Sequence, residues 1–592
     1  MKGLSEIKNE LRKDIEEGMK KENIPGLAIS LVDRDGIIWS EGFGYTDRSE
    51  EKKVDSKTLF SIQSTGKTLT AASFLLSVQD GKIGLDDRLV DYYPEFSVKS
   101  RFDTDEVSKI TFRHLLSHKA GLTHEAPEGS NYDAGDCTFE EHIKSINDTW
   151  LKSKVGQEYA YSNLGFDLVA YVLQKMSGMS FPEYVNEVLA EPLGIEHLIY
   201  DKEEAMATGN AAVGYTGSFP SKFENMVIYG AGCPYMSVDG LSRYVMMQLN
   251  DGKVDGERLI DETLLDEMRA VQFPADRQEG GYGLGLGYNP YMFPGVDVYH
   301  HGGGGFGFLG YMMWAQGPGY GVVVESNQEA FNSTFMNVAA KAMKMMLDKE
   351  GIELDESKEK VYTDLPEMEM SIGELKRYEG SYVCATFEMV LEVKEDELKA
   401  AIGDMEFTLT PHSETVFTTD KPPGMEFFFD NGEPEHIEYM NSQGDINYFY
   451  NQFVNKERNY ETEGLEERFG IYIGKMYGNP FYVGLKMDDG NLKLYFHGSE
   501  YVMDEYEPGV FFTAHGESLE FSEDELIFRN IRSERFELDL EEIFEAADNY
   551  PEDRRAYIPS LMDLAGVLKF LDMEDYEKVQ EKAEELKEEH FS

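Results

Sequence analysis

The chain has 592 residues, with 112 Asp and Glu against 55 Lys and Arg and a formal net charge of −57 at pH 7. This balance repels nucleic acid and anionic membrane surfaces and excludes both as partners, while it favours solubility or the attraction of cationic substrates. Hydrophobic residues make up 41% of the chain, which excludes a disordered protein, and the length requires several domains.

The sequence predicts a cytoplasmic protein. No run reaches the roughly 18 consecutive apolar residues that a membrane span needs, and residues 1–10 are charged where a secretory signal is apolar. An extracytoplasmic location is expected if a signal was removed. Cys137, Cys233 and Cys384 are widely spread, so neither a disulfide framework nor a thiolate metal site is expected.

The first part of the chain predicts a sheet flanked by helices. Apolar residues at helical spacing indicate a helix over 4–22, and two apolar runs around Asp33-Arg34-Asp35-Gly36 indicate a hairpin. Residues 280–288 are expected as a glycine-rich strand, and 330–347 as a long helix that packs on the sheet beside the first helix. The fold class predicted for residues 1–350 is α/β (α+β), with an antiparallel sheet.

The second part of the chain has a different pattern of apolar and turn residues. A charged linker over 351–365 precedes short strands and turns. A weak repeat at a spacing of about 90 residues predicts two all-β antiparallel barrel (lipocalin-like) modules, over 366–460 and 461–545. In this repeat Leu375-x-x-Tyr378-x-Gly380-x-Tyr382 resembles Leu465-x-x-x-Phe469-Gly470-x-Tyr472. Residues 546–592 are expected to form an acidic helical tail.

The first segment that can carry chemistry is Ser64-Thr65-Gly66-Lys67, at the start of a predicted helix. Ser64 and Lys67 share one helix face, and the free N–H groups of the first turn favour negative charge near the serine. A nucleophile requires this setting and a base within reach. The Ser-x-x-Lys spacing is common by chance, so it indicates a catalytic site only if the rest of the chain supplies further catalytic groups.

A second segment, Tyr161-Ser162-Asn163, lies in a loop at a predicted helix start, where Tyr161 and Asn163 can point into one cleft. With Ser64 as nucleophile, Lys67 is either a neutral base or a cation that stabilises deprotonated Tyr161. Tyr161 then takes the serine proton and passes it to the leaving group. Asn163 is expected to orient Lys67 or the substrate.

The third segment is the glycine run His301-Gly302-Gly303-Gly304. Gly302, Gly304 and Gly307 satisfy G-x-G-x-x-G, but a strand and hairpin follow where a dinucleotide site requires a helix. These glycines instead allow a strand edge to approach a substrate closely. His301, Gly303 and Gly304 are therefore substrate-binding candidates, and the N–H groups of Ser64 and Gly304 are candidates for an oxyanion hole.

Together, the three motifs resemble the serine β-lactamase and penicillin-binding-protein superfamily, in the branch of class C β-lactamases, D-aminopeptidases, DD-carboxypeptidases and related esterases. The resemblance covers residues 1–350. It implies an acyl-enzyme mechanism carried by Ser64, Lys67 and Tyr161, and it places His301 at the family's His-x-Gly position. Flanking segments resemble the family too: Ile24-Pro25-Gly26-Leu27, 110–118, Pro192-Leu193-Gly194-Ile195 and Tyr282-Gly283-Leu284-Gly285.

The third motif departs from true β-lactamases, which carry Lys-Thr-Gly and use the lysine to help bind a substrate carboxylate. Because histidine is mostly neutral at pH 7, β-lactam recognition is expected to be weaker, and the variant resembles D-aminopeptidases and esterases. D-aminopeptidase-like relatives also carry C-terminal barrels, one of which can send a loop into the active site. An acidic loop of this kind would bind a substrate ammonium group.

The predicted function is a serine hydrolase, a D-aminopeptidase-like or DD-peptidase-like peptidase or amidase that can also act as an esterase. The alternatives are a penicillin-binding-type binder or sensor that acylates without efficient turnover, and a carboxylesterase or weak β-lactamase. No cofactor and no metal are expected, and His118 and His124 are interpreted as loop or core histidines. The expected partner is a peptide or small-molecule substrate, and a homo-oligomer is compatible with the sequence.

Overall fold

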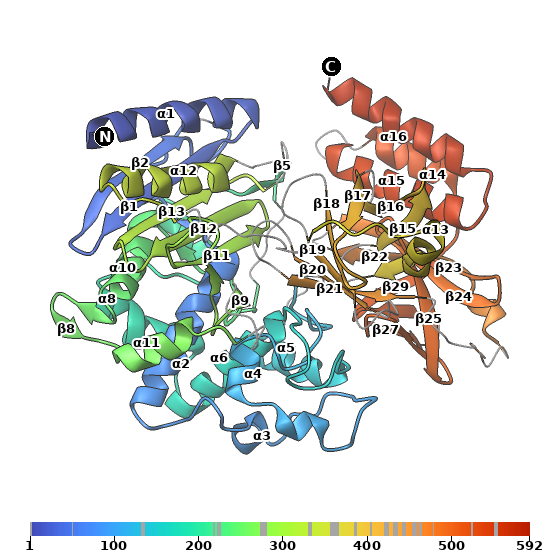
Figure 1. Cartoon of the computed structure of the whole chain (residues 1–592), viewed down its shortest axis with the longest axis horizontal. Coiled ribbons are helices and arrows are strands. Elements are labelled where there is room, and N and C mark those ends of the chain that lie inside the picture. The colour runs from blue at the N-terminus through green and yellow to red at the C-terminus, as the bar shows by residue number, and fades with distance from the viewer. Residues whose placement is uncertain are drawn as a thin grey trace. The chain divides into compact units, whose positions relative to one another are not determined.

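The computed structural model divides into two compact units, Met1–Glu359 and Lys360–Ser592 (Figure 1). The structure describes residues 3–591 apart from 50, 132–136, 217–218, 222–225, 273–280, 330–333, 356–365, 384–387, 403–404, 420–425, 430–435, 441–445, 453–457, 459, 461–463, 477–478, 523–524 and 550–553. Among the described residues, no helix combines the length and apolar character needed to cross a bilayer.

The first unit is built on a seven-stranded antiparallel sheet in the order β2-β1-β13-β12-β11-β10-β9. The predicted hairpin forms β1 and β2, and β1 also pairs with β13, so strands from the two ends of the unit are neighbours. The strands are β1 (Gly26–Asp33), β2 (Ile37–Gly44), β9 (Gly281–Tyr282), β10 (Gly287–Asn289), β11 (Val298–Gly305), β12 (Phe308–Ala315) and β13 (Tyr320–Ser326).

Helices cover both faces of this sheet (Figure 1). On one face, α1 (Leu4–Lys21) and α12 (Thr334–Lys349) share a core with alternate strand residues such as Met313. On the other face, a second core includes Met312 and the helices α2 (Gly66–Gln79), α6 (Asn163–Ser177) and α10 (Val238–Leu249). The predicted α/β class and the packing of the long helix beside the first one are confirmed.

One predicted strand is wrong in detail. The described part of 280–288 forms two short strands, β9 and β10, joined by a tight turn. Gly285 adopts a φ of +76°, and the Gly283 N–H donates to the carbonyl of Leu286 at 2.8 Å. This turn brings Gly285 against α2, where an added Cβ would lie 3.0 Å from the Lys67 carbonyl oxygen. The glycines therefore provide close packing on the Ser64 helix.

The second unit contains two closed eight-stranded antiparallel barrels, which confirms the all-β class predicted for this region. The first barrel comprises β14 (Gly380–Val383), β15 (Glu388–Lys394), β16 (Glu397–Ile402), β17 (Met405–Pro411), β18 (Val416–Thr419), β19 (Glu426–Phe429), β20 (His436–Met440) and β21 (Ile446–Asn451). The second comprises β22 (Gly470–Met476), β23 (Asn479–Asp488), β24 (Asn491–Phe496), β25 (Ser499–Glu507), β26 (Val510–Thr513), β27 (Ser518–Ser522), β28 (Glu525–Phe528) and β29 (Ile531–Phe536).

The sequence repeat corresponds to the same structural feature in each barrel. The Tyr382 hydroxyl donates to the carbonyl of Tyr378 at 3.0 Å, and the Tyr472 hydroxyl donates to the carbonyl of Arg468 at 2.6 Å. Each tyrosine is buried in the first strand of its barrel and reaches back four residues to a 3₁₀ turn. The repeat therefore fixes the entry of the chain into each barrel.

The C-terminal tail packs against the second barrel and shares a hydrophobic cluster with it. The helices α14 (Leu540–Asn549), α15 (Arg554–Phe570) and α16 (Tyr576–Phe591) begin six residues before the predicted tail. Leu564 and Val579 are fully buried in one cluster with Ile471 and Tyr482 of the barrel. Of the predicted linker, 351–355 packs on the first unit, where the Asp355 N–H donates to the Pro294 carbonyl; residues 356–365 lie outside the described residues.

Candidate active site

Ser64 and Lys67 form the centre of the site. Ser64 lies in η1 (Gln63–Thr65), a 3₁₀ turn that continues into α2. The fully buried Lys67 Nζ donates to Ser64 Oγ at 3.1 Å, and to Asn163 Oδ1 and the Ala231 carbonyl at 2.7 Å each. A lysine ammonium has three N–H donors and no acceptor. The two carbonyl oxygens can only accept, whereas Ser64 Oγ can accept a third N–H from a charged Lys67 or donate its proton to a neutral one, so the arrangement suits either of the roles expected for Lys67.

Tyr161 borders the same ammonium group. Its ring centroid lies 4.9 Å from Lys67 Nζ, a cation–π distance. The residue is half-buried just before α6, and its hydroxyl hydrogen-bonds to none of the described residues. The hydroxyl is therefore available to a reacting group.

Asn163 connects Lys67 to a buried acid. Its Oδ1 accepts from Lys67, while its Nδ2 donates to Glu125 Oε1 at 2.6 Å. Asn131 donates to the same carboxylate oxygen at 2.5 Å. Burial raises the pKa of Glu125 to about 7, against the hydrogen bond from Asn163, which lowers it. Because Glu125 accepts from the amide nitrogen, the amide oxygen of Asn163 must face Lys67.

The Ala231 carbonyl is held by a second buried acid. Asp167 Oδ1 accepts from the N–H groups of Gly230 and Ala231 at 2.9 and 3.2 Å, and Asp167 Oδ2 lies 3.2 Å from His142 Nε2. Burial alone would lower the pKa of His142, but the hydrogen bond and charge of Asp167 outweigh it and raise that pKa. This pair fixes the loop whose carbonyl positions Lys67.

His118 is a buried histidine, as the sequence predicts, and it also supports the site. Its Nδ1 accepts the Ser162 N–H at 3.0 Å, and its ring packs on Tyr161 with the centroids 4.2 Å apart. Burial, with the charge of Lys67 as a smaller cause, lowers the pKa of His118 well below its usual value. A neutral His118 therefore positions the loop that carries Tyr161.

The glycine run lies on β11, directly against the turn that carries Ser64. A Cβ added to Gly303 would lie 2.4 Å from the Ile62 carbonyl oxygen and 2.9 Å from the Ser64 nitrogen. Pairing of β11 with β10 ends at His300, whereas pairing with β12 continues to Gly305. One edge of β11 is therefore outside the sheet's pairing beside Ser64, and Gly304 is exposed there.

His301 is buried beside this edge as a neutral imidazole. Its Nδ1 donates to the Gly302 carbonyl at 2.6 Å, so its Nε2, 3.0 Å from the Tyr282 oxygen, accepts the tyrosine proton. Burial, and then the charge of Lys67, lowers the pKa of His301 to about 3. The third motif therefore presents no positive charge to a substrate carboxylate.

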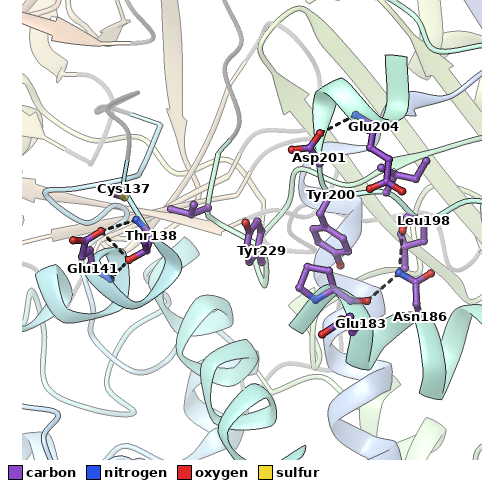
Figure 2. Close-up of a pocket in the computed structure, with 13 residues that line it drawn as sticks. Cys137, Thr138, Glu141, Glu183, Asn186, Leu198, Tyr200, Asp201, Glu204 and Tyr229 are labelled. Carbon is purple, nitrogen blue, oxygen red and sulfur yellow. Dashed lines mark hydrogen bonds between the residues drawn. The ribbon is translucent and has the colours of Figure 1, made fainter. Parts of the chain in front are cut away.

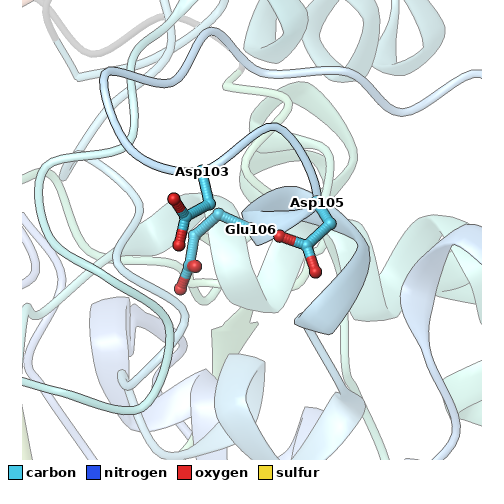
Figure 3. A group of neighbouring side chains, drawn as sticks. All are labelled: Asp103, Asp105 and Glu106. Carbon is cyan, nitrogen blue, oxygen red and sulfur yellow. The ribbon is translucent and has the colours of Figure 1, made fainter.

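Away from this site, Asp103, Asp105 and Glu106 converge with their oxygens within 4.8 Å of one another (Figure 3). Lys109 Nζ lies 2.8 Å from Glu106 Oε2 and 3.5 Å from Asp105 Oδ1. Glu106 Oε1 also accepts the Val155 N–H at 2.8 Å. Since Lys109 already pairs with two of the three carboxylates, we interpret the group as a structural ion-pair cluster.

The structure brings the predicted residues Ser64, Lys67, Asn163 and Tyr161 together and places β11 against them. The sequence-based reasoning missed Glu125, Asp167 and His142. Asp167 could have been singled out from the sequence, because it is the single acid inside the otherwise apolar run 164–173 and a buried acid needs a partner.

Comparison with known proteins agrees with this fold and geometry. The Beta-lactamase family model matches residues 11–342, so the chain belongs to the Beta-lactamase family. The resemblance to the serine β-lactamase and penicillin-binding-protein superfamily is thereby confirmed.

Relatives with known names are distant. The Protein flp of Staphylococcus aureus (strain COL) is 26% identical over 40% of this chain and 48% of its own length. Beta-lactamase-like protein 2 of Dictyostelium discoideum is 28% identical over 45% of this chain and 49% of its own. The chain thus spans about half the length of the curated relatives it matches.

Solved structures share the fold over a longer range. The octameric penicillin-binding protein homologue from Pyrococcus abyssi matches with a TM-score of 0.51 and 22% identity, over 74% of this chain and 99% of that one. Crystal structures of SurE match with TM-scores of 0.53 (with D-Leu) and 0.55, each at 18% identity and over 75% of this chain and 99% of the other.

Proposed function

We propose that this chain is a peptidase or amidase that works through an acyl-enzyme on Ser64 and also hydrolyses activated esters. The observation that carries the proposal is the 3.1 Å contact between Lys67 Nζ and Ser64 Oγ, with Lys67 held from two other sides by Asn163 and Ala231. A serine hydroxyl acts as a nucleophile when a neighbouring group removes its proton and the geometry is fixed in advance.

In the proposed reaction, the Lys67 ammonium stabilises the phenolate form of Tyr161, which accepts the proton of Ser64 as Oγ attacks the acyl carbon. The oxyanion of the tetrahedral intermediate is stabilised by the N–H groups of Ser64 and Gly304. Tyr161 returns the proton to the leaving amine or alcohol, and the ester on Ser64 remains. Water then attacks this ester and gives a proton to Tyr161, which passes it to Ser64 Oγ as the acyl–oxygen bond breaks and the acid is released.

Two features support a peptide substrate over a β-lactam. The edge of β11 beyond His300 can pair with the main chain of an extended peptide, as exposed strand edges commonly do. The buried neutral His301 replaces the cation that would attract a β-lactam carboxylate. We extend the proposal to D-residues next to the scissile bond, because one structural neighbour, SurE, was solved with D-Leu.

A panel of chromogenic substrates tests the proposal: D- and L-alanine p-nitroanilides, p-nitrophenyl acetate and a chromogenic cephalosporin. The wild-type chain is expected to turn over the D-anilide and the ester repeatedly and to process the cephalosporin least. Ser64→Ala should lose at least about a thousandfold in rate, as expected for a removed nucleophile. Ser73→Ala, on the same helix but outside the site, serves as the control.

Mass spectrometry of the quenched reaction should find the acyl group on the peptide that contains Ser64. Full activity in Ser64→Ala would contradict the mechanism. A stoichiometric adduct without turnover of any substrate would contradict the hydrolase and favour a penicillin-binding-type binder.

A further inference from the structure

The first unit contains a cavity of about 700 Å³ that none of the candidate active-site residues lines (Figure 2). Its walls come from the segment around Thr138 before α5 (Phe139–Ser145), from α7 (Phe181–Val185) and its continuation, and from 198–204. A volume of this size accommodates a small organic molecule. Figure 2 shows Tyr229 and Tyr200 next to each other, with Thr138 and Glu141 on one side and Asp201, Glu204 and Asn186 on the other.

The charge of the cavity wall is entirely negative among the described residues. Glu141, Glu183, Asp201 and Glu204 line the cavity, and its described lining includes no Lys, Arg or His. Glu141, Glu183 and Glu204 form no ion pair with any residue that the structure describes. All three side chains are exposed, and Glu141 and Glu183 each accept the backbone N–H of the N-cap residue of their own helix. The cavity wall therefore carries a net negative charge, which favours a positively charged occupant.

Two aromatic rings form a corner of the same cavity. The rings of Tyr200 and Tyr229 lie 5.6 Å apart at 80° to one another. Phe139 packs on Tyr229 with the centroids 5.1 Å apart, which holds that ring in place. Aromatic side chains are the groups with which proteins commonly bind alkylated ammonium ions.

The largely buried Tyr200 side chain, with its unpartnered hydroxyl, gives a third and independent indication of a ligand. Tyr200 is 9% exposed, and its hydroxyl has no hydrogen-bond partner among the described residues. Most of the side chain is buried while the hydroxyl stays open to the cavity, so the hydroxyl is available to bond with a molecule there. Asn186 also lines the cavity and has both amide protons engaged, with the carbonyls of Pro182 and Leu198, so that its Oδ1 is an acceptor.

We propose that this cavity is a second binding site, which takes an organic ammonium ion: an alkylated or primary amine whose charge faces the carboxylates and whose carbon groups contact Tyr200 and Tyr229. The site is separate from Ser64, but one of its residues is next in sequence to residues that position Lys67. Tyr229 directly precedes Gly230 and Ala231, the residues that Asp167 holds and that supply a carbonyl to Lys67.

Isothermal titration calorimetry on the full-length wild-type chain tests this proposal with choline, with 1,4-diaminobutane, and with 3,3-dimethyl-1-butanol, the uncharged isostere of choline. At least one amine is expected to bind, and choline should bind at least about tenfold more tightly than its isostere, because only the charge differs. Binding should weaken as salt is raised. Equal binding of choline and its isostere, or no binding of either amine at millimolar concentration, would overturn the proposal.

Matched variants locate the site. Glu183→Gln combined with Glu204→Gln should raise the Kd of the binding amine about tenfold, whereas Glu187→Gln combined with Glu203→Gln should leave it within about twofold. The control pair removes the same charge from exposed positions close by in the same segments, outside the cavity. Equal effects of the two pairs would overturn the assignment.

The aromatic corner has its own test. Tyr229→Leu should weaken the binding of choline at least about fivefold, while Tyr229→Phe, which keeps the ring, should retain it. Circular dichroism of each variant confirms that the chain is folded. Unchanged binding in Tyr229→Leu would show that the amine binds elsewhere.

Discussion

The amide oxygen of Asn163 lies 2.7 Å from Lys67 Nζ, and the amide nitrogen of the same side chain donates to the buried Glu125. Lys67 is therefore positioned by Asn163, and the orientation of Asn163 is in turn set by Glu125. The consequence is that a change at Glu125, which does not touch Ser64, is transmitted to the reacting group through a single side chain.

Asn163→Ala is expected to reduce the rate of acylation of Ser64 by about 10- to 100-fold, because Lys67 loses one of its three acceptors. A hydrogen bond to a charged group contributes about 1.5–3 kcal/mol, which corresponds to that range. The burst of nitrophenol from p-nitrophenyl acetate measures this rate. Asn131→Ala is the matched control, since Asn131 also donates to Glu125 but makes no contact with Lys67; a loss of equal size in the control would contradict the positioning role.

Glu125→Gln is expected to change how stability depends on pH. The folded chain raises the pKa of Glu125 to about 7 from an ordinary value of 4.5. Between these pH values the folded state holds a proton that the unfolded state has released, so the wild type loses stability as pH rises. Relative to Glu125→Gln, this loss should reach about 3 kcal/mol by pH 8.

Urea unfolding at pH 5 and pH 8 measures this difference, with tryptophan fluorescence as the probe. The three tryptophans, Trp39, Trp150 and Trp314, all lie in the first unit, so the signal reports on that unit alone. Equal pH dependence in the wild type and Glu125→Gln would show that Glu125 titrates normally.

The contrast between the predicted and the missed residues has a physical cause. Ser64 and Lys67 belong to one helix start, and Asn163 begins another helix, so local sequence spacing identifies them. Lys67 is held in place by contacts between residues far apart in the sequence. One of them is with the Ala231 carbonyl, 164 positions away. A backbone carbonyl has no signature in the sequence. The fold was predictable for the same reason as the motifs, because hairpins and amphipathic helices are encoded locally.

His301→Gln is expected to leave the shape of the pH–rate profile unchanged between pH 5 and 9. His301 has its pKa lowered to about 3 and stays neutral throughout this range, so a neutral amide replaces a neutral imidazole. The magnitude of kcat/KM should fall less than about tenfold, as for the loss of one neutral hydrogen bond. Profiles measured with p-nitrophenyl acetate test this; the disappearance of an inflection near neutral pH in the variant would mean that His301 titrates in the wild type.

Gly303→Ala is expected to reduce kcat/KM by at least about 100-fold, because the new methyl group would lie 2.4 Å from the Ile62 carbonyl oxygen and 2.9 Å from the Ser64 nitrogen. Both contacts are with backbone atoms, so relief requires β11 and the nucleophile turn to separate. The proposed oxyanion position between Ser64 and Gly304 would then widen.

Gly302→Ala is the matched control for this change, since its methyl group would approach nothing closer than a Tyr311 ring carbon at 3.4 Å. It should retain activity within about threefold of the wild type, as expected for ordinary van der Waals contact. Circular dichroism and tryptophan fluorescence of both variants separate a displaced nucleophile from a failure to fold. If Gly302→Ala and Gly303→Ala lost activity equally, the close approach of β11 to Ser64 would not be what the glycine run provides, and backbone freedom along the whole strand would be the better explanation.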